Sequence, residues 1–127
     1  GAFFEEEAPP GEEFVFRGSE RKPVALTGVP RTKARAEELL PPRLSGGERA
    51  YLVHFLPGAK LPRHFLVHKG EEWGYLASGA VAVTVGAETR ELKAGDSLFL
   101  ESEIPAGWHN RGEEMATLVW IVKGKYL

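Results

Sequence analysis

The sequence predicts an all-β domain, a sandwich or barrel made of short antiparallel strands. From residue 48 onward, β-prone runs of about five to eight residues follow one another, with glycine or proline at most junctions. Only one stretch, 32–40, has the composition of a helix. No unit of roughly 20 to 50 residues repeats, which excludes solenoid and propeller folds.

The composition is that of one globular domain. The chain has 127 residues, of which 43% are hydrophobic, and this is enough for a single core. We assign residues 14–127 to the domain. Residues 1–13 are acidic and contain prolines, with too little apolar surface to fold alone, so we expect a linker or arm there.

Charge and cysteine content exclude several classes of function. Sixteen basic and 18 acidic residues give a net charge of -2, and no stretch has the density of Lys and Arg that a nucleic-acid surface needs. We therefore do not expect this chain alone to bind DNA. The absence of cysteine excludes disulfides and thiolate metal sites, and fits a cytoplasmic protein. No apolar run has the length of a signal peptide or a membrane helix.

The first forty residues predict strands at the edge of the fold. Residues 14–16 and 23–27 are short β-prone runs, and edge strands often pair with a partner, which favours a homodimer. The segment 32–40 has helical propensity and ends at two prolines. We nevertheless expect a strand at 32–40, because propensity is weak and only pairing would give this segment a role in a barrel.

The rest of the chain predicts a nearly continuous series of strands. A run at 61–68, the turn Lys69-Gly70 and a run at 71–79 predict a hairpin. The remaining predicted strands are 49–56, 80–85, 88–92, 98–100 and 115–122, of which the last is apolar on both faces and therefore central. We expect Asp96 and Asn110 to fix turns with their side chains.

Two spaced motifs resemble those of the cupin superfamily. His68, Glu72 and Gly79 match the second half of the first cupin motif. The second motif, in a longer-spaced form, is matched by Gly95-Asp96, Ile104-Pro105 and Asn110. The resemblance covers about the last seventy residues, and it implies a cupin-type jelly-roll β-barrel of antiparallel strands, with an N-terminal arm contributing edge strands.

A narrower resemblance points to gene regulation. The segments HKGEEWGYLASG, GDSLFLESEIP and ATLVWIV resemble the C-terminal sensor domain of bacterial transcription regulators of the xenobiotic-response-element type, which join a helix-turn-helix to a cupin. The opening GAFFEEE resembles the end of the DNA-binding unit, and the chain starts at Gly1 instead of Met. The resemblance implies a fragment that reaches DNA only through an N-terminal helix-turn-helix domain absent from this chain.

The resemblance leaves a metal site incomplete. Cupin sites use a His-x-His pair, a glutamate and a third histidine, a set suited to divalent transition metals. His68 and Glu72 match two of these positions, whereas Leu66 and Ala106 stand at the others. His64 and His109 are the possible replacements. His64 would lie about 13 Å along a regular strand from His68, near the rim, and His109 would face away from Ala106 unless a bulge intervened.

We therefore expect no cofactor and a pocket for a small organic ligand. His68 and Glu72 would orient a polar group of the ligand, since a buried imidazole and carboxylate are costly without a purpose, although a mutual structural hydrogen bond would also explain them. Gly74 would leave space for the ligand. The apolar walls would be Leu66, Leu76, Phe99 and Trp108. For the aromatic residues Phe99, Trp108 and Trp120, core packing is the alternative role.

Two functions follow from these expectations. The first is a non-enzymatic sensor domain of a cytoplasmic regulator, in which a small-molecule effector inside the barrel shifts a homodimer and no residue is catalytic. The alternative is a stand-alone cupin enzyme, dioxygenase- or isomerase-like, with one divalent transition metal held by His64, His68, Glu72 and His109.

Overall fold

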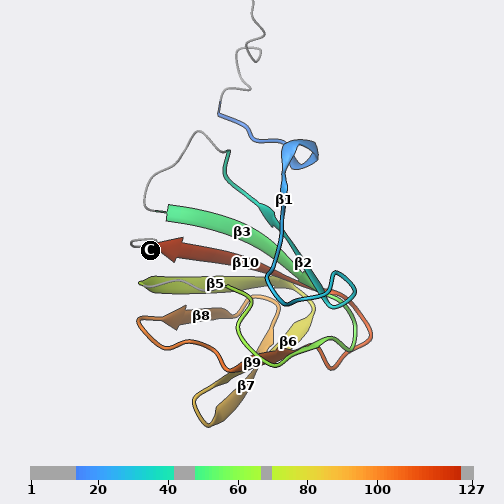
Figure 1. The fold of residues 1–127 in the computed structure, drawn as a ribbon, viewed down its shortest axis with the longest axis vertical. Coiled ribbons are helices and arrows are strands. Elements are labelled where there is room, and N and C mark those ends of the chain that lie inside the picture. The colour runs from blue at the N-terminus through green and yellow to red at the C-terminus, as the bar shows by residue number, and fades with distance from the viewer. Residues whose placement is uncertain (1–13, 42–47, 67–69, 124–127) are drawn as a thin grey trace, which may run out of the picture.

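Two antiparallel sheets face each other in the computed structural model, which describes residues 14–41, 48–66 and 70–123 (Figure 1). A single turn of 3-10 helix, η1 (Gly18–Glu20), precedes the strands. The strands are β1 (Pro23–Val24), β2 (Ala34–Glu38), β3 (Glu48–Phe55), β4 (Lys60–Leu61), β5 (Glu71–Ser78), β6 (Ala80–Val85), β7 (Glu88–Lys93), β8 (Ser97–Leu100), β9 (Gly107–His109) and β10 (Ala116–Lys123). The described residues contain no α-helix, and the predicted all-β jelly-roll fold is confirmed.

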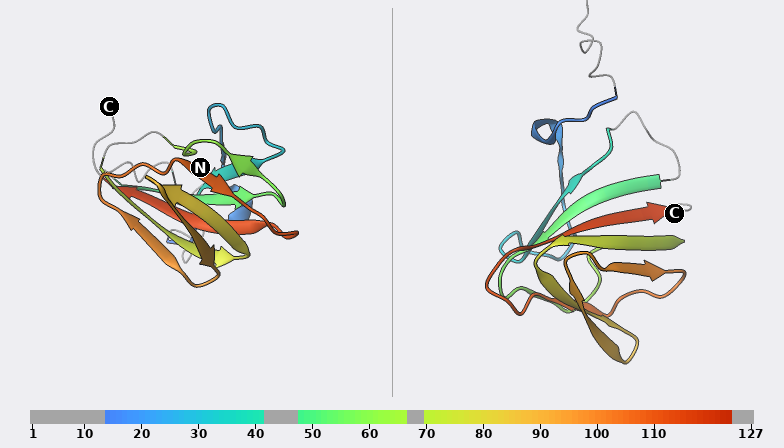
Figure 2. Two further views of the ribbon diagram at one scale, coloured as in Figure 1. Left: turned by 90° about the horizontal axis from the view of Figure 1, so that it is seen from below. Right: turned by 180° about the vertical axis from the view of Figure 1, so that it is seen from behind.

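The larger sheet has the order β1-β2-β3-β10-β5-β8, and the smaller has the order β4-β9-β6-β7. The last strand, β10, lies in the middle of the larger sheet between β3 and β5, as its apolar character on both faces predicts. In Figures 1 and 2, η1 lies at one end of the molecule and the hairpin of β6 and β7 at the other.

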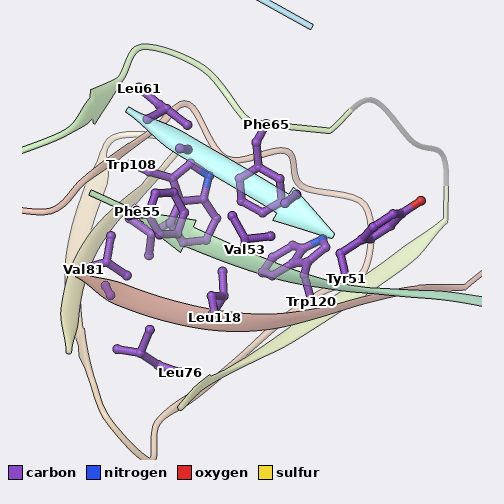
Figure 3. Close-up of a cluster of buried hydrophobic side chains, with 14 of the residues drawn as sticks. Tyr51, Val53, Phe55, Leu61, Phe65, Leu76, Val81, Trp108, Leu118 and Trp120 are labelled. Atoms are coloured by element: carbon purple, nitrogen blue, oxygen red, sulfur yellow. The ribbon is translucent and has the colours of Figure 1, made fainter. Parts of the chain in front are cut away.

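The core lies between the sheets because side chains alternate along each strand. On β10, Leu118 and Trp120 are fully buried, and on β5 the inward positions include Glu72, Gly74 and Leu76. An aromatic cluster closes the centre of this core (Figure 3). Its main members are Phe55, Phe65, Trp108 and Trp120.

The strand predicted at 32–40 is confirmed by β2, which pairs with β1 and β3. Its Ala34 and Ala36 are buried against the core, and this tertiary pairing outweighs the local preference for helix. The edge strand predicted at 23–27 is present as β1. The strand predicted at 14–16 was wrong, since these residues are irregular. The predicted arm, 1–13, lies outside the described residues.

The hairpin predicted from 61–68 and 71–79 was wrong. Among the described residues of this run, Leu61 alone is in a strand, as part of β4, which pairs with β9, and residues 62–66 are irregular. Residues 67–69, which include the predicted turn residue Lys69, lie outside the described residues. Pro62 cannot donate a backbone hydrogen bond, which ends the ladder there. β5 pairs instead with β10 and β8.

Two side chains fix turns as predicted. Asp96 accepts a hydrogen bond from the backbone N–H of Lys93 at 2.8 Å. Asn110 is buried, donates to the carbonyls of Phe55 and Glu114 at 3.0 and 2.8 Å, and accepts from the N–H of Gly112 at 3.0 Å. Within the described residues, the chain has no helix with the length and hydropathy needed to cross a membrane.

Candidate functional site

The interior of the barrel contains a hydrogen-bonded network of two indoles, one imidazole and one carboxylate. Trp108 Nε1 donates to His64 Nδ1 at 3.1 Å. His64 Nε2 lies 2.9 Å from Glu72 Oε1, and Trp120 Nε1 donates to the same oxygen at 2.7 Å. All four residues are at most 7% exposed. His64 and Glu72 are two of the three buried polar or charged side chains in the described residues, and Asn110 is the third.

Both sheets contribute to the network. Glu72 on β5 faces inward and lies in register with Val122 of β10 and Leu100 of β8. Trp120 comes from β10 of the same sheet, whereas Trp108 comes from β9 of the smaller sheet. The network therefore links the two layers of the barrel.

His64 enters the network from the irregular segment after β4. Its ring centroid lies 4.3 Å from that of Phe65, 6.0 Å from that of Trp108 and 5.4 Å from that of Trp120. The rim position expected for His64 was wrong, because Pro62 ends the strand and the irregular backbone turns the imidazole into the core.

The hydrogen-bond donors define the protonation of His64. An indole N–H donates and cannot accept, so the Nδ1 atom facing Trp108 carries a lone pair. The imidazole proton is then on Nε2 and is donated to Glu72. A second proton on Nδ1 would place two donors against each other. The network holds His64 as one neutral tautomer, and it supplies Glu72 Oε1 with two N–H donors that offset its burial.

Three atoms of this network, the two nitrogens of His64 and Oε1 of Glu72, make internal hydrogen bonds where the fold family implies a metal site. A metal needs a nitrogen lone pair, and the one that His64 has receives the Trp108 N–H. Glu72 Oε1 already accepts two hydrogen bonds. Among the described residues there is no group of three or more His, Cys, Asp or Glu side chains placed to hold a metal. His68, a predicted ligand, lies outside the described residues.

The predicted replacement ligand His109 lies elsewhere. On β9 the inward position is taken by Trp108, so His109 faces out and lines a hollow of about 320 Å³ with Lys60, Thr84 and Arg111. Ala106, at the position of the third histidine, is exposed. The structure thus brings His64 and Glu72 together and separates His109 from them.

The structure also relocates parts of the predicted pocket. Gly74 faces inward, but the space above it is filled, since a Cβ there would lie 2.5 Å from Trp120 Cε3. The prediction that Gly74 leaves room for a ligand was wrong. Phe99 was wrongly assigned to the barrel wall: it is 56% exposed on the outer face, opposite Trp73. Leu76 and Trp108 are buried in the core and Leu66 is partly buried against it, and their contact with a ligand stays a prediction.

Sequence reasoning found Glu72 but missed its partners. It named His64 only as a possible metal ligand and left Trp120 out of the site. A signal was present, because a buried tryptophan usually needs a hydrogen-bond partner for its N–H. Two tryptophans in apolar strands, beside a carboxylate predicted to face inward, indicate such a partner.

The sequence was compared with protein-family models and with curated proteins. The family model of the Cupin domain matches residues 51–122. No curated protein matches the sequence significantly.

Several solved structures share the fold. An RmlC-like cupin from Shewanella frigidimarina superposes with a TM-score of 0.68 at 18% identity, over 88% of this chain and 91% of its own. KdgF from Halomonas sp. superposes with a TM-score of 0.64 at 18% identity, over 87% of this chain and 93% of KdgF. The Cupin_2 domain of an XRE family transcriptional regulator from Enterobacter cloacae superposes with a TM-score of 0.63 at 14% identity, over 72% of this chain and 97% of that domain.

Some similar structures are longer than this chain. It spans 45% of AerE from Microcystis aeruginosa and 65% of the Cnp3 cupin domain structure from Schizosaccharomyces pombe. The identities are low, so these likenesses concern the fold alone. The family model, however, matches more than half of the 127 residues. The chain belongs to the cupin superfamily.

Proposed function

We propose that this cupin domain is a non-catalytic sensor of a small organic effector, acting within a cytoplasmic transcription regulator. The observation that carries the proposal is the closed network around His64 and Glu72. Both nitrogens of His64 and one oxygen of Glu72 are occupied by internal hydrogen bonds, so neither side chain presents an acid, a base or a metal ligand on those atoms.

The same network supplies a mechanism for sensing. A ligand that binds Glu72 through Oε1 must replace the N–H of Trp120 or of His64, because both groups donate to this oxygen. Trp120 lies on β10, whose neighbours are β3 and β5, so its movement disturbs the middle of the larger sheet. Ligand binding and a change in the sheet are thereby coupled, as a population shift requires.

The regulatory context rests on the sequence resemblance and on the likeness to the cupin domain of the Enterobacter cloacae regulator. In this proposal, DNA is contacted by a helix-turn-helix domain outside the chain, and the cupin domain acts as a homodimer. Measuring the intact mass of the natural protein in a cell extract tests this part. A mass larger than 14.0 kDa by a small helical domain supports it, and a mass near 14.0 kDa contradicts it.

A metal-dependent cupin enzyme is the alternative. The observation in its favour is the buried imidazole–carboxylate pair itself, since enzymatic cupins such as a sugar phosphate isomerase from Silicibacter pomeroyi share the fold. Metal analysis and native mass spectrometry of gently purified protein distinguish the two. We expect an organic adduct and no stoichiometric metal. One divalent ion per chain, lost in Glu72→Ala but retained in the surface variant Glu88→Ala, would establish the alternative.

A further inference from the structure

A second hollow, on the outside of the barrel, has three arginines among its nine lining residues. Its volume is about 430 Å³, and it lies where η1, β1 and the start of β2 meet the outer face of β3. Its lining residues include Arg21, Arg31, Arg35, Glu37 and His54. This size is within the range of small-molecule sites.

The strands bring these side chains to one face. Arg35 of β2 lies directly opposite His54 of β3, and Glu37 is two residues further along the same face of β2. Arg21 follows η1, and Arg31 precedes β2. The three arginines therefore come from separate segments and converge on the same hollow.

The charges in the hollow are not balanced. Glu37 is the only carboxylate in its lining, and it lies 3.4 Å from Arg21 Nη1 and 3.6 Å from His54 Nε2. Arg31 and Arg35 have no ion pair within the part of the chain that the structure describes. Three guanidinium groups and one carboxylate leave a formal charge of +2 with His54 neutral. A concave site lined by one sign of charge attracts the opposite charge.

The hydrogen-bonding capacity in the hollow is also incompletely used. Arg21 Nε is buried and has no hydrogen-bond partner among the described residues. Arg35 Nε makes only a long contact of 3.4 Å to the carbonyl of Arg31. Guanidinium groups bind carboxylate and phosphate oxygens in pairs, which would use these donors.

We infer that this hollow is a binding site for a small organic oxyanion, a molecule with a terminal phosphate or carboxylate group. The arginines bind the anionic group, and Pro23 and Met115 contact the rest of the molecule. A bare ion would fill only a small part of about 430 Å³. The hollow lies outside the barrel, so this ligand is separate from the effector proposed for the interior.

Binding of phenyl phosphate and benzoate tests the inference, with benzyl alcohol as the neutral control. The titrations follow backbone amide resonances of the 127-residue chain at low ionic strength. We expect either anion to shift the resonances of residues 31–37 saturably below about 10 mM, and the neutral alcohol not to do so. The tighter of the two anions identifies the preferred group. Because both anions would bind through ionic contacts, their binding should weaken in about 0.5 M salt.

Matched variants locate the site. Arg35→Gln and Arg31→Gln should each weaken binding about tenfold, whereas Arg90→Gln, which removes an exposed arginine on β7, should leave it unchanged. Glu37→Gln removes the competing carboxylate and should strengthen binding several-fold, a gain that a damaged fold would not produce. The inference is overturned if neither anion shifts residues 31–37 at 10 mM, or if Arg90→Gln weakens binding as much as Arg35→Gln.

Discussion

An indole N–H can only donate a hydrogen bond, and this property decides the state of His64. Because Trp108 donates to Nδ1, the imidazole is held as one tautomer, and its single ring N–H, on Nε2, donates to Glu72. The network combines two polar groups with two aromatic rings that are themselves part of the core. Removing a single donor should therefore disturb both the packing and the polar balance of the barrel.

Trp108→Phe tests this dependence. The substitution keeps most of the aromatic ring but leaves His64 Nδ1 without its donor, so we expect the free energy of unfolding to fall by about 1–3 kcal/mol. Urea denaturation measures the change. Trp73→Phe is the matched control, because Trp73 is 39% exposed on the outer face. Equal stability of the two variants would mean that the network contributes nothing measurable.

Tyr51 gives the domain a sensitivity to alkaline pH. It is 8% exposed on β3, and burial raises the pKa of its phenol above 10.0. The folded state then holds this proton more tightly than the unfolded state does. The resulting stability is complete below the unfolded pKa and is lost as the pH rises through the folded pKa, that is, above about pH 10.

We expect Tyr51→Phe to lose less of its thermal stability than the wild type when the pH is raised from about 9 to 11. Melting curves by circular dichroism provide the measurement. Tyr75→Phe, on the exposed face of β5, serves as the control and should follow the wild type. If the wild type and Tyr51→Phe lost the same amount of thermal stability, Tyr51 would not be the cause of the sensitivity to alkaline pH.

At the level of strands, the close packing of β5 and β10 depends on a glycine of β5, Gly74. Gly74 lies in register with Trp120, and the indole lies over the position that a side chain at 74 would occupy. Gly74→Ala would place a Cβ 2.5 Å from Trp120 Cε3 and 3.1 Å from the carbonyl of Val119. We expect a loss of about 1–3 kcal/mol in the free energy of unfolding.

Gly112→Ala is the matched control, because its Cβ would meet Asn110 Oδ1 only at 3.5 Å. It should change the denaturation midpoint little. If Gly74→Ala were as stable as Gly112→Ala, Trp120 would have to move without cost, and the space above Gly74 would be available to a ligand after all.

The sequence predicted most strands because glycine and proline mark their ends and apolar residues mark their buried faces. The segment that forms β2 has helical propensity, but it was predicted as a strand because only strand pairing would give it a role in a barrel. The failure at 61–68 has a local cause: alternation continues through Pro62 in the sequence, but the hydrogen-bond ladder does not. His64 was therefore predicted to lie at the rim. Its contact with Glu72 requires an irregular backbone, which the two-residue alternation of a strand cannot predict.

For the whole molecule, the outer face of the larger sheet is unusually apolar. Cross-strand register aligns Ala50, Ile121, Trp73 and Phe99 in one row across β3, β10, β5 and β8. A second row contains Leu52, Val119 and Tyr75. Trp73, Tyr75 and Phe99 are 39%, 43% and 56% exposed. Contiguous apolar patches of this kind are typical of interaction surfaces.

We expect a second copy of the chain to cover this face. Among the described residues of the first forty, the edge strand available to the predicted homodimer is β1, whose two residues offer few hydrogen bonds. The outer face instead offers two apolar rows over four strands, and a two-fold axis that runs parallel to the sheet, between the two copies, would bring the same face of both copies together.

The double variant Trp73→Glu/Phe99→Glu should convert the dimer to a monomer, because four carboxylates would be buried near one another in the interface. Sedimentation equilibrium measures the mass, for which the single chain gives 14.0 kDa. Thr89→Glu/Arg90→Glu places two carboxylates on the exposed β7, with a charge change of -3 instead of -2 per chain, and should remain dimeric. A wild type that is monomeric at high concentration would leave the apolar face without its proposed partner. A dimer that survives the double variant would assign the contact to the β1 edge. The two variants thus separate the face from the edge, while melting curves check that both remain folded.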